Sequence, residues 1–204
     1  PAFVAEQIDT LFADVRVDAV KIGMLGQQAV IRAVAERLAH WQPEHLVIDP
    51  VMVAKSGDHL LERQAIHELR DNLLPLATIL TPNLPEAGVL LGSSAVESLK
   101  EMRRVAEKLR RLLNDSGERW VFLKGGHLPG DDTIDILYDG HRKIWITSIS
   151  GSEAYQSMPV GEVELLERCC VASAQTPGQA VVAGIRYAAR RSHTAYGSLT
   201  RPSS

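Results

Sequence analysis

Short apolar runs alternate with long amphipathic segments through most of this chain, and no other feature limits its fold more. The runs cover residues 17–22, 45–49, 78–80 and 120–123, and the amphipathic segments between them cover residues 27–41, 60–74, 84–91 and 95–113. Parallel neighbouring strands need crossovers of about a dozen residues or more, usually helices. The alternation therefore predicts an α/β fold with a doubly wound, mainly parallel sheet and helices on both faces.

The remaining segments extend this fold at both ends. Residues 2–15 have helical periodicity, residues 134–138 and 143–149 flank an Asp139-Gly140 turn and predict an antiparallel hairpin, and residues 162–175 and 179–191 predict two closing helices. We therefore expect a single domain over residues 1–192 and a polar tail over residues 193–204. Because the chain starts at Pro1 inside a helical pattern and not with methionine, we expect this domain to be incomplete at its N-terminus.

Charge and hydropathy narrow the choice of partners. The net charge is −3 and the 22 Lys and Arg residues are spread along the chain, so we expect neither nucleic acid nor a membrane surface as a partner. No apolar run approaches the roughly 18 residues of a membrane-spanning helix, and the N-terminus lacks a signal-peptide pattern. Cys169 and Cys170 are adjacent and are expected to stay reduced, because vicinal disulfides are strained. These features predict a cytoplasmic protein that acts on small molecules.

Polar residues follow the ends of three predicted strands, which is where open α/β sheets bind their ligands. Asp49 follows the second run, Asn83 and Glu86 follow the third at a spacing of one helical turn, and Lys124, Gly125 and Gly126 follow the fourth. The carboxylates of Asp49 and Glu86 are ligands that Mg²⁺ accepts, and a lysine beside glycine amides suits phosphate oxygens. The pattern favours a metal and phosphate site.

Each of these residues also has an ordinary structural interpretation. Asp49 can cap the loop after its strand, Glu86 can be a first-turn acid favoured by the helix dipole, and Lys124-Gly125-Gly126 can be a flexible turn before the hairpin. Their occurrence at successive strand ends favours the functional interpretation, and the residues alone leave both open.

Four motifs resemble those of a known family. Residues 21–26 (KIGMLG), 49–61 (DPVMVAKSGDHLL), 80–92 (LTPNLPEAGVLLG) and 122–127 (FLKGGH) occur in the same order as in the hydroxymethylpyrimidine/phosphomethylpyrimidine kinases of the ribokinase-like superfamily. The resemblance implies ATP-dependent phosphorylation of 4-amino-5-hydroxymethyl-2-methylpyrimidine and of its monophosphate in thiamine biosynthesis. It also implies ATP as co-substrate, Mg²⁺ as cofactor and a homodimer.

The same resemblance implies roles for individual residues. Met24 and Val51 would line the pyrimidine pocket. Residues that would bind ATP and its phosphates are Asp49, Asn83, Lys124, Gly125 and Gly126, and those that would hold Mg²⁺ are Glu86 and Asp49.

Two features of the family are not found in this sequence. We expect the family's first strand with its glycine-rich segment to be missing, which would leave an exposed sheet edge, and the Gly-Thr-Gly-Cys motif is not found. The nearest stretch to that motif is Pro159-Val160-Gly161-Glu162, where Glu162 is the candidate catalytic base or an ordinary acidic residue in a first helical turn. The alternatives are therefore a catalytically impaired fragment or paralogue that binds nucleotide, pyrimidine or a protein partner, and a kinase of pyridoxine-type vitamin B6 alcohols.

Overall fold

The computed structural model describes residues 1–52, 61, 63–93, 96, 98–126, 132–141 and 143–149. The helices expected over residues 162–175 and 179–191 and the tail expected over residues 193–204 lie outside the described residues. The same holds for Glu162, Cys169 and Cys170.

A six-stranded sheet forms the centre of the fold. Its strands are β1 (Val20–Ile22), β2 (Leu46–Ile48), β3 (Ile79–Leu80), β4 (Trp120–Leu123), β5 (Asp132–Tyr138) and β6 (Lys143–Ile149), and they lie side by side in sequence order. The strands β1 to β4 pair in parallel, and β5 and β6 continue the sheet as an antiparallel hairpin. The mainly parallel α/β fold expected from the sequence, with its closing hairpin, is confirmed.

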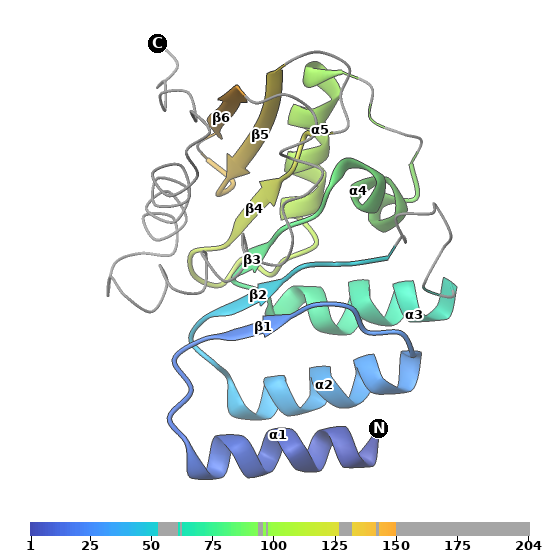
Figure 1. Ribbon diagram of the computed structural model, residues 1–204, viewed down its shortest axis with the longest axis vertical. Helices are drawn as coiled ribbons and strands as arrows, with labels where there is room; N and C mark the ends of the chain where they lie inside the picture. Colours follow the sequence, from blue (N-terminus) through green and yellow to red (C-terminus); the bar gives the residue numbers. More distant parts are fainter. Residues whose placement is uncertain are drawn as a thin grey trace.

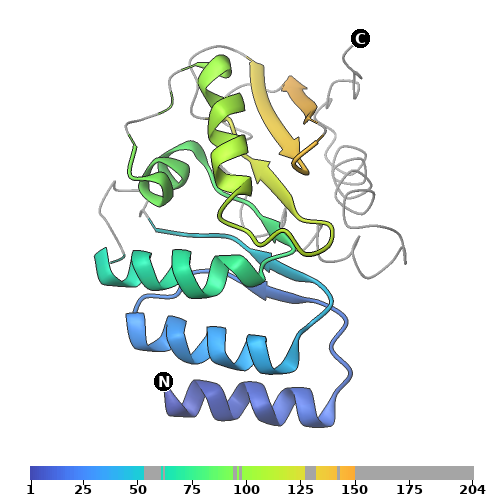
Figure 2. The same cartoon turned by 180° about the vertical axis from the view of Figure 1, so that it is seen from behind.

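The crossover helices lie on one face of this sheet. The described helices are α1 (Ala2–Asp14), α2 (Gln28–Trp41), α3 (Arg63–Glu68), α4 (Leu84–Leu91) and α5 (Leu99–Arg110). Both views place α2, α3 and α5 over the same face (Figure 1, Figure 2). Right-handed crossovers explain this, because parallel strands that always advance in one direction put every crossover helix on the same side. No helix in the described part of the chain is long and apolar enough to cross a membrane.

The opposite face of the sheet is apolar as well. Side chains alternate between the two faces along each strand. Buried residues that share a core with the helices include Ile48, Leu80, Val121 and Leu123, whereas Val47, Ile79, Trp120, Phe122 and Leu137 are buried outside that core. A sheet that is apolar on both faces is typical of doubly wound folds.

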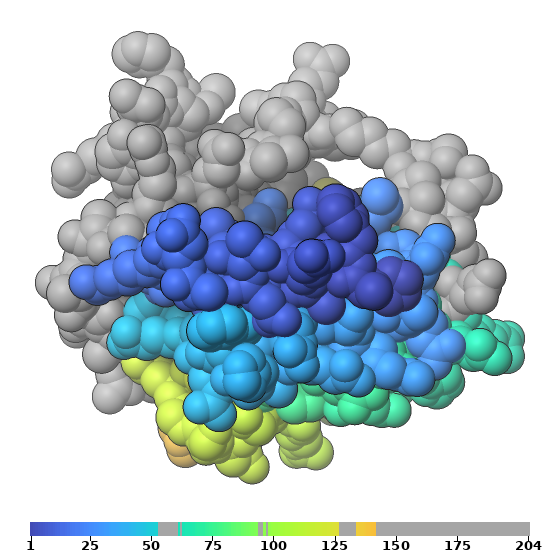
Figure 3. Space-filling model, turned by 90° about the horizontal axis from the view of Figure 1, so that it is seen from below, coloured from blue at the N-terminus to red at the C-terminus, as the bar shows by residue number. Residues whose placement is uncertain are grey.

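The first helix, α1, packs against α2 and forms the outermost layer in the view from below (Figure 3). The Trp41 indole donates to the Asp9 carboxylate at 2.7 Å, and Arg37 pairs with the same carboxylate at 3.2 Å. Phe12 stacks on Trp41 with ring centroids 5.4 Å apart. Together these contacts fix α1 beside α2.

The segment predicted as one helix over residues 60–74 changes its winding along its length. A π-helical turn at Leu69–Leu73 and a 3-10 turn at Leu74–Leu76 follow α3. Pro75 lacks an amide hydrogen, so the regular α-helical hydrogen bonds cannot continue through it. The helix predicted to start at residue 95 starts instead at Leu99, because the Ser98 hydroxyl accepts the Glu101 amide and caps it.

A buried carboxylate joins α3 to α2. Glu68 accepts hydrogen bonds from Arg32 at 2.8 Å, from Gln28 at 3.2 Å and from Asn72 at 2.7 Å. The hydrogen bonds from Arg32 are the largest cause that lowers the pKa of Glu68 to about 2, against the opposing effect of its burial. Glu68 therefore stays ionised inside the helical layer.

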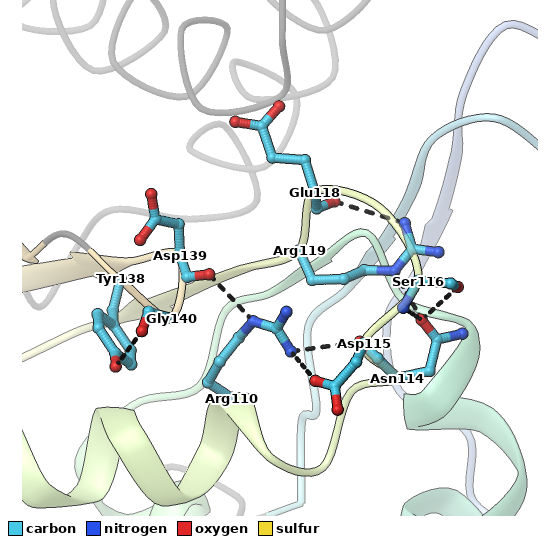
Figure 4. A network of polar contacts seen from close by, with 9 residues as sticks. All are labelled: Arg110, Asn114, Asp115, Ser116, Glu118, Arg119, Tyr138, Asp139 and Gly140. Atoms are coloured by element: carbon cyan, nitrogen blue, oxygen red, sulfur yellow. Dashed lines mark hydrogen bonds and ion pairs between the residues drawn. The ribbon is translucent and has the colours of Figure 1, made fainter.

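A polar network fastens the end of α5 to the hairpin (Figure 4). Arg110 Nε donates to the carbonyl of Asp139, in the turn between β5 and β6, at 3.2 Å. The same guanidinium donates to the Asn114 carbonyl at 3.2 Å and pairs with Asp115 at 3.6 Å. Arg110 thereby anchors the β5–β6 turn against the helix that precedes β4.

Candidate functional site

The carboxyl ends of β2, β3 and β4 bring the predicted site residues to one edge of the sheet. The backbone hydrogen-bond ladder continues past the strands. The amides of Asp49, Thr81 and Lys124 donate to the carbonyl oxygens of Ile22, Ile48 and Pro82, respectively, each at 2.9 Å. Asn83 and Lys124 form a further parallel bridge. The backbone itself therefore sets Asp49, Asn83 and Lys124 side by side.

Lys124 and Asp49 form an ion pair at this edge. Lys124 Nζ lies 3.2 Å from Asp49 Oδ1, and the side chains are only 20% and 14% exposed. The Thr81 hydroxyl donates to the same oxygen at 3.2 Å and is itself buried. Asp49 is thus held by one cation and one hydroxyl group.

Asn83 and Glu86 form a reciprocal cap at the start of α4. The Asn83 side chain accepts the Glu86 amide at 2.8 Å, and the Glu86 carboxylate accepts the Asn83 amide at 2.8 Å. This is the capping-box arrangement that the spacing of three residues permits. Glu86 is therefore an acidic residue in the first turn of α4, as its structural interpretation expected. A role in metal binding stays a prediction.

The Glu86 carboxyl group has an unusual protonation equilibrium. It is 4% exposed, and its burial is the main cause that raises the pKa of Glu86 to about 7. The charge of Asp49 raises the pKa further, whereas the amides of Asn83 and Met52 and the charge of Lys124 lower it. The carboxyl group of Glu86 therefore lies within electrostatic range of Asp49 and Lys124.

The Lys124-Gly125-Gly126 segment is held on both sides. The Gly125 amide donates to Asp135 Oδ1 on β5 at 2.8 Å. A Cβ atom on Gly125 would come to 1.9 Å from the Ile134 carbonyl oxygen and 2.9 Å from the Met102 Cε atom. Close packing alone therefore requires glycine here. Because this amide already has an acceptor, the predicted binding of phosphate by Gly125 stays a prediction.

The two predicted pocket residues have different surroundings. Val51 lines a small apolar hollow, whereas the Met24 side chain is 59% exposed and does not line it. The other residues around the hollow are Gly23, Leu25, Ile31, Ile48, Pro50, Met52, Leu61 and Leu69. Some of these residues, Ile48 and Pro50, are the sequence neighbours of Asp49, so the hollow lies at the ends of β1 and β2. A shared pyrimidine pocket for Met24 and Val51 stays a prediction.

The donor set at this edge fits Mg²⁺. Within the described ranges, no three His, Cys, Asp or Glu side chains gather as a metal-binding cluster. Magnesium needs no such cluster, because it is commonly bound through one or two carboxylates together with substrate phosphates and water. Asp49 and Glu86 would supply two hard oxygen ligands of this kind from the ends of neighbouring strands.

Two contributors to the site were missed by the sequence predictions. Thr81 orients Asp49, and its position directly after an apolar run was the available signal. Asp135 holds Gly125 from a different strand, which no local spacing reveals. The candidate base Glu162 lies outside the described residues.

The sequence is similar to those of known enzymes. A family profile described as phosphomethylpyrimidine kinase matches residues 1–154. The chain is 47% identical over 140 residues to the thiamine biosynthesis bifunctional protein ThiED of Geobacter sulfurreducens, covering 69% of this chain and 28% of that protein. It is 44% identical over 138 residues to the hydroxymethylpyrimidine/phosphomethylpyrimidine kinase of Escherichia coli, covering 68% of this chain and 50% of that protein. The chain thus spans half or less of the length of these two relatives.

Solved structures share the fold. A crystal structure of phosphomethylpyrimidine kinase from Clostridium difficile matches with 34% identity and a TM-score of 0.68, over 90% of this chain and 72% of that chain. Pyridoxal kinase from Staphylococcus aureus in complex with ADP matches with 30% identity and a TM-score of 0.74, over 90% of this chain and 65% of that chain. These similarities confirm the ribokinase-like fold expected from the sequence.

Proposed function

This chain belongs to the phosphomethylpyrimidine kinase family, and from that premise we propose that it transfers the γ-phosphoryl group of ATP to 4-amino-5-hydroxymethyl-2-methylpyrimidine and to its monophosphate. The observation that carries this proposal is the group formed by Lys124, Asp49 and Glu86 at the carboxyl ends of the central strands. Phosphoryl transfer depends mainly on positioning and on neutralising phosphate charge, and this edge supplies groups for both.

Lys124 is the group that would meet the nucleotide phosphates. Its ammonium is held 3.2 Å from Asp49 on a flexible stem, so it needs only a change of side-chain torsions to reach an incoming phosphate. Asp49 would keep the ammonium at the strand ends until the nucleotide arrives. The buried Thr81 hydroxyl would keep the Asp49 carboxylate oriented during this exchange.

Asp49 and Glu86 would hold Mg²⁺. The ion, when bound, neutralises charge on the phosphate oxygens. Glu86 is fixed by its cap with Asn83, and Asn83 would therefore act by positioning Glu86. A cation would compete with the proton that burial favours on Glu86, so this carboxyl group would release its proton on binding.

Met24, Val51, Gly126 and Glu162 complete the proposed site with less direct support. Val51 would contribute apolar contact to the pyrimidine ring, and the exposed Met24 would close over it. The Gly126 amide is the remaining candidate donor to phosphate oxygens. Glu162 is the candidate base for the attacking hydroxyl group, on the strength of the sequence alone.

We also propose a cytoplasmic location and a homodimer. The relatives named as thiamine-biosynthesis kinases support a small-molecule substrate, and the adjacent cysteines suit a reducing compartment. The homodimer rests on the family resemblance, and sedimentation of the full chain tests it. A mass of one chain at micromolar concentration would contradict it.

The experiment that tests the function compares two alcohols at saturating MgATP. We expect phosphate-ester formation on the hydroxymethylpyrimidine with a kcat/KM at least about tenfold above that on pyridoxal, which the Staphylococcus aureus relative binds. Phosphorylation of the pyrimidine monophosphate should follow in the same assay. A preference for pyridoxal would instead indicate a kinase of vitamin B6 alcohols. Binding of ATP without turnover of either alcohol would indicate a catalytically impaired protein.

A further inference from the structure

We propose that Asp135 is a positioning residue for phosphoryl transfer, which holds the Lys124-Gly125-Gly126 segment so that the Lys124 ammonium stays at the strand ends. This inference rests on the proposed function. It assigns a role to a carboxylate that lies outside the four motifs that identify the family.

The burial of Asp135 is the first observation. Three carboxylates are buried among the described residues, namely Glu68, Glu86 and Asp135, and the last is 5% exposed. Glu68 has a guanidinium partner and Glu86 has its helix cap. Burying a carboxylate is costly unless its hydrogen bonds are satisfied, so a buried acid indicates a specific contact.

The contact of Asp135 with Gly125 is the second observation. The β4–β5 ladder ends with the pair Leu123 and Ile136, and the same register would place Lys124 opposite Asp135. Past this point the Gly125 amide donates to Asp135 Oδ1 at 2.8 Å and not to a backbone carbonyl. At Gly125, directly after Lys124, the carboxylate of Asp135 thus takes the place of the backbone acceptor that a continued ladder would supply. A side-chain oxygen at this short distance satisfies the Gly125 amide and restrains it beside β5.

The fit around Gly125 is the third observation. Its Cα lies so close to the Ile134 backbone that a Cβ would come to 1.9 Å from the Ile134 oxygen. On the other side, the Lys124 amide donates to Pro82 at 2.9 Å. The segment is therefore held between the end of β3 and β5. On the β5 side, Ile134 packs against Gly125 and Asp135 accepts its hydrogen bond. Misplacement by about 1 Å of a group that contacts the reacting phosphate can cost on the order of 100-fold in rate.

A mutant cycle between Asp135 and Lys124 tests this role through kcat/KM for ATP at saturating hydroxymethylpyrimidine. Asp135→Ala should lower kcat/KM by about 10- to 100-fold, with the KM for the pyrimidine unchanged. In a Lys124→Met background the same substitution should change kcat/KM by no more than about twofold, because no ammonium is left to misplace. Equal losses in both backgrounds would indicate a merely structural role and would overturn the proposal.

Two further variants separate the tether from general damage to the hairpin. Asp135→Asn keeps an acceptor oxygen for the Gly125 amide and should stay within about threefold of the unmodified protein. Asp139→Ala is the matched control, because this carboxylate accepts the His141 amide at 2.7 Å in the same hairpin, away from Lys124. It should leave kcat/KM within about twofold. A loss with Asp139→Ala as large as that with Asp135→Ala would count against the proposal.

Two measurements on the nucleotide-free protein decide the inference if the proposed function fails or if Asp135→Ala does not fold. The Gly125 amide should exchange its hydrogen slowly in the unmodified protein, and unprotected exchange would overturn the tether. Lys124 should react several-fold faster with an amine-acylating ester in Asp135→Ala, or in Asp135→Ser if alanine prevents folding, than in Asp139→Ala. Equal reactivity would overturn the positioning role whether or not the protein turns over a pyrimidine.

Discussion

Lys124 and Asp49 lie 75 positions apart in sequence, yet their charged groups are 3.2 Å apart at the carboxyl ends of β4 and β2. Both side chains are largely withdrawn from solvent, and a third residue, Thr81, hydrogen-bonds to the same carboxylate oxygen. The pair is therefore partly buried, and the loss of one partner would leave the other charge poorly satisfied. It links the stability of the sheet edge to the chemistry proposed there.

The first prediction concerns the coupling within this pair. In a double-mutant cycle with Asp49→Asn and Lys124→Met, we expect a coupling energy of about 1–3 kcal/mol in the free energy of unfolding without nucleotide. The control is the exposed pair Arg16 and Asp18, whose atoms approach to 2.8 Å but whose side chains are 90% and 46% exposed. Its coupling should stay below about 0.5 kcal/mol. Similar coupling energies for the two pairs in urea denaturation would contradict the assignment.

The second prediction concerns Glu86, whose pKa is raised from 4.5 to about 7 by burial. Below the unfolded-state pKa both states carry the proton, whereas between pH 4.5 and about 7 only the folded state keeps it. The folded state therefore loses stability as the pH rises through this window, by roughly 3 kcal/mol in total. Glu86→Gln keeps an acceptor for the Asn83 amide and removes the titration. In metal-free buffer, the difference in unfolding free energy between the two proteins should change by this amount, and a constant difference would refute it.

The third prediction concerns Glu68, whose pKa is lowered from 4.5 to about 2, chiefly by hydrogen bonds from Arg32. The ionised form is favoured in the folded state, so its stabilising effect is complete above pH 4.5 and is lost as the pH falls towards 2. Glu68→Gln should therefore be less stable than the unmodified protein near neutral pH, and the gap should close in acid. Glu6→Gln, on the exposed surface of α1, should show no such closing gap in thermal unfolding across the same pH range.

The fourth prediction concerns Gly125. Gly125→Ala should destabilise the fold by on the order of 3 kcal/mol, because the added methyl group overlaps the Ile134 backbone and cannot be accommodated by a side-chain rotation. Gly26→Ala is the control, since a Cβ there meets nothing within 4 Å. Its unfolding free energy should stay within about 1 kcal/mol of the unmodified value. Equal stability of the two variants would show that Gly125 is not packed as described.

Much of the fold could be predicted because its signals are local. Each apolar run is short and ends in Gly, Pro or a polar residue, and each crossover has helical periodicity, so the strands at residues 46–48 and 120–123 were found almost at their boundaries. Asp49, Asn83, Glu86 and Lys124 were expected together because parallel strands end at one edge. The first-turn position predicted for Glu86 is confirmed, and its spacing from Asn83 permits the capping box that the structure shows.

What the sequence did not reveal depends on contacts between distant elements. The bond from Gly125 to Asp135 joins two strands through a side chain, and the close approach of Ile134 that requires Gly125 is a packing effect. The π-helical turn at Leu69–Leu73 likewise leaves no periodic signal that distinguishes it from an α-helix. The exposure of Met24 depends on loop conformation, which hydrophobicity does not specify.

The measurement that tests the central claim most directly is the rate of phosphate-ester formation from MgATP and hydroxymethylpyrimidine by the unmodified chain and by Lys124→Met. We expect the unmodified chain to form the ester and Lys124→Met to lose at least about 100-fold in kcat/KM for ATP, because a preorganised cation at the phosphate is removed. The KM for the pyrimidine should stay within about threefold. Equal rates for the two proteins would contradict the claim that this strand edge, centred on Lys124 and Asp49, is the phosphate site of a kinase.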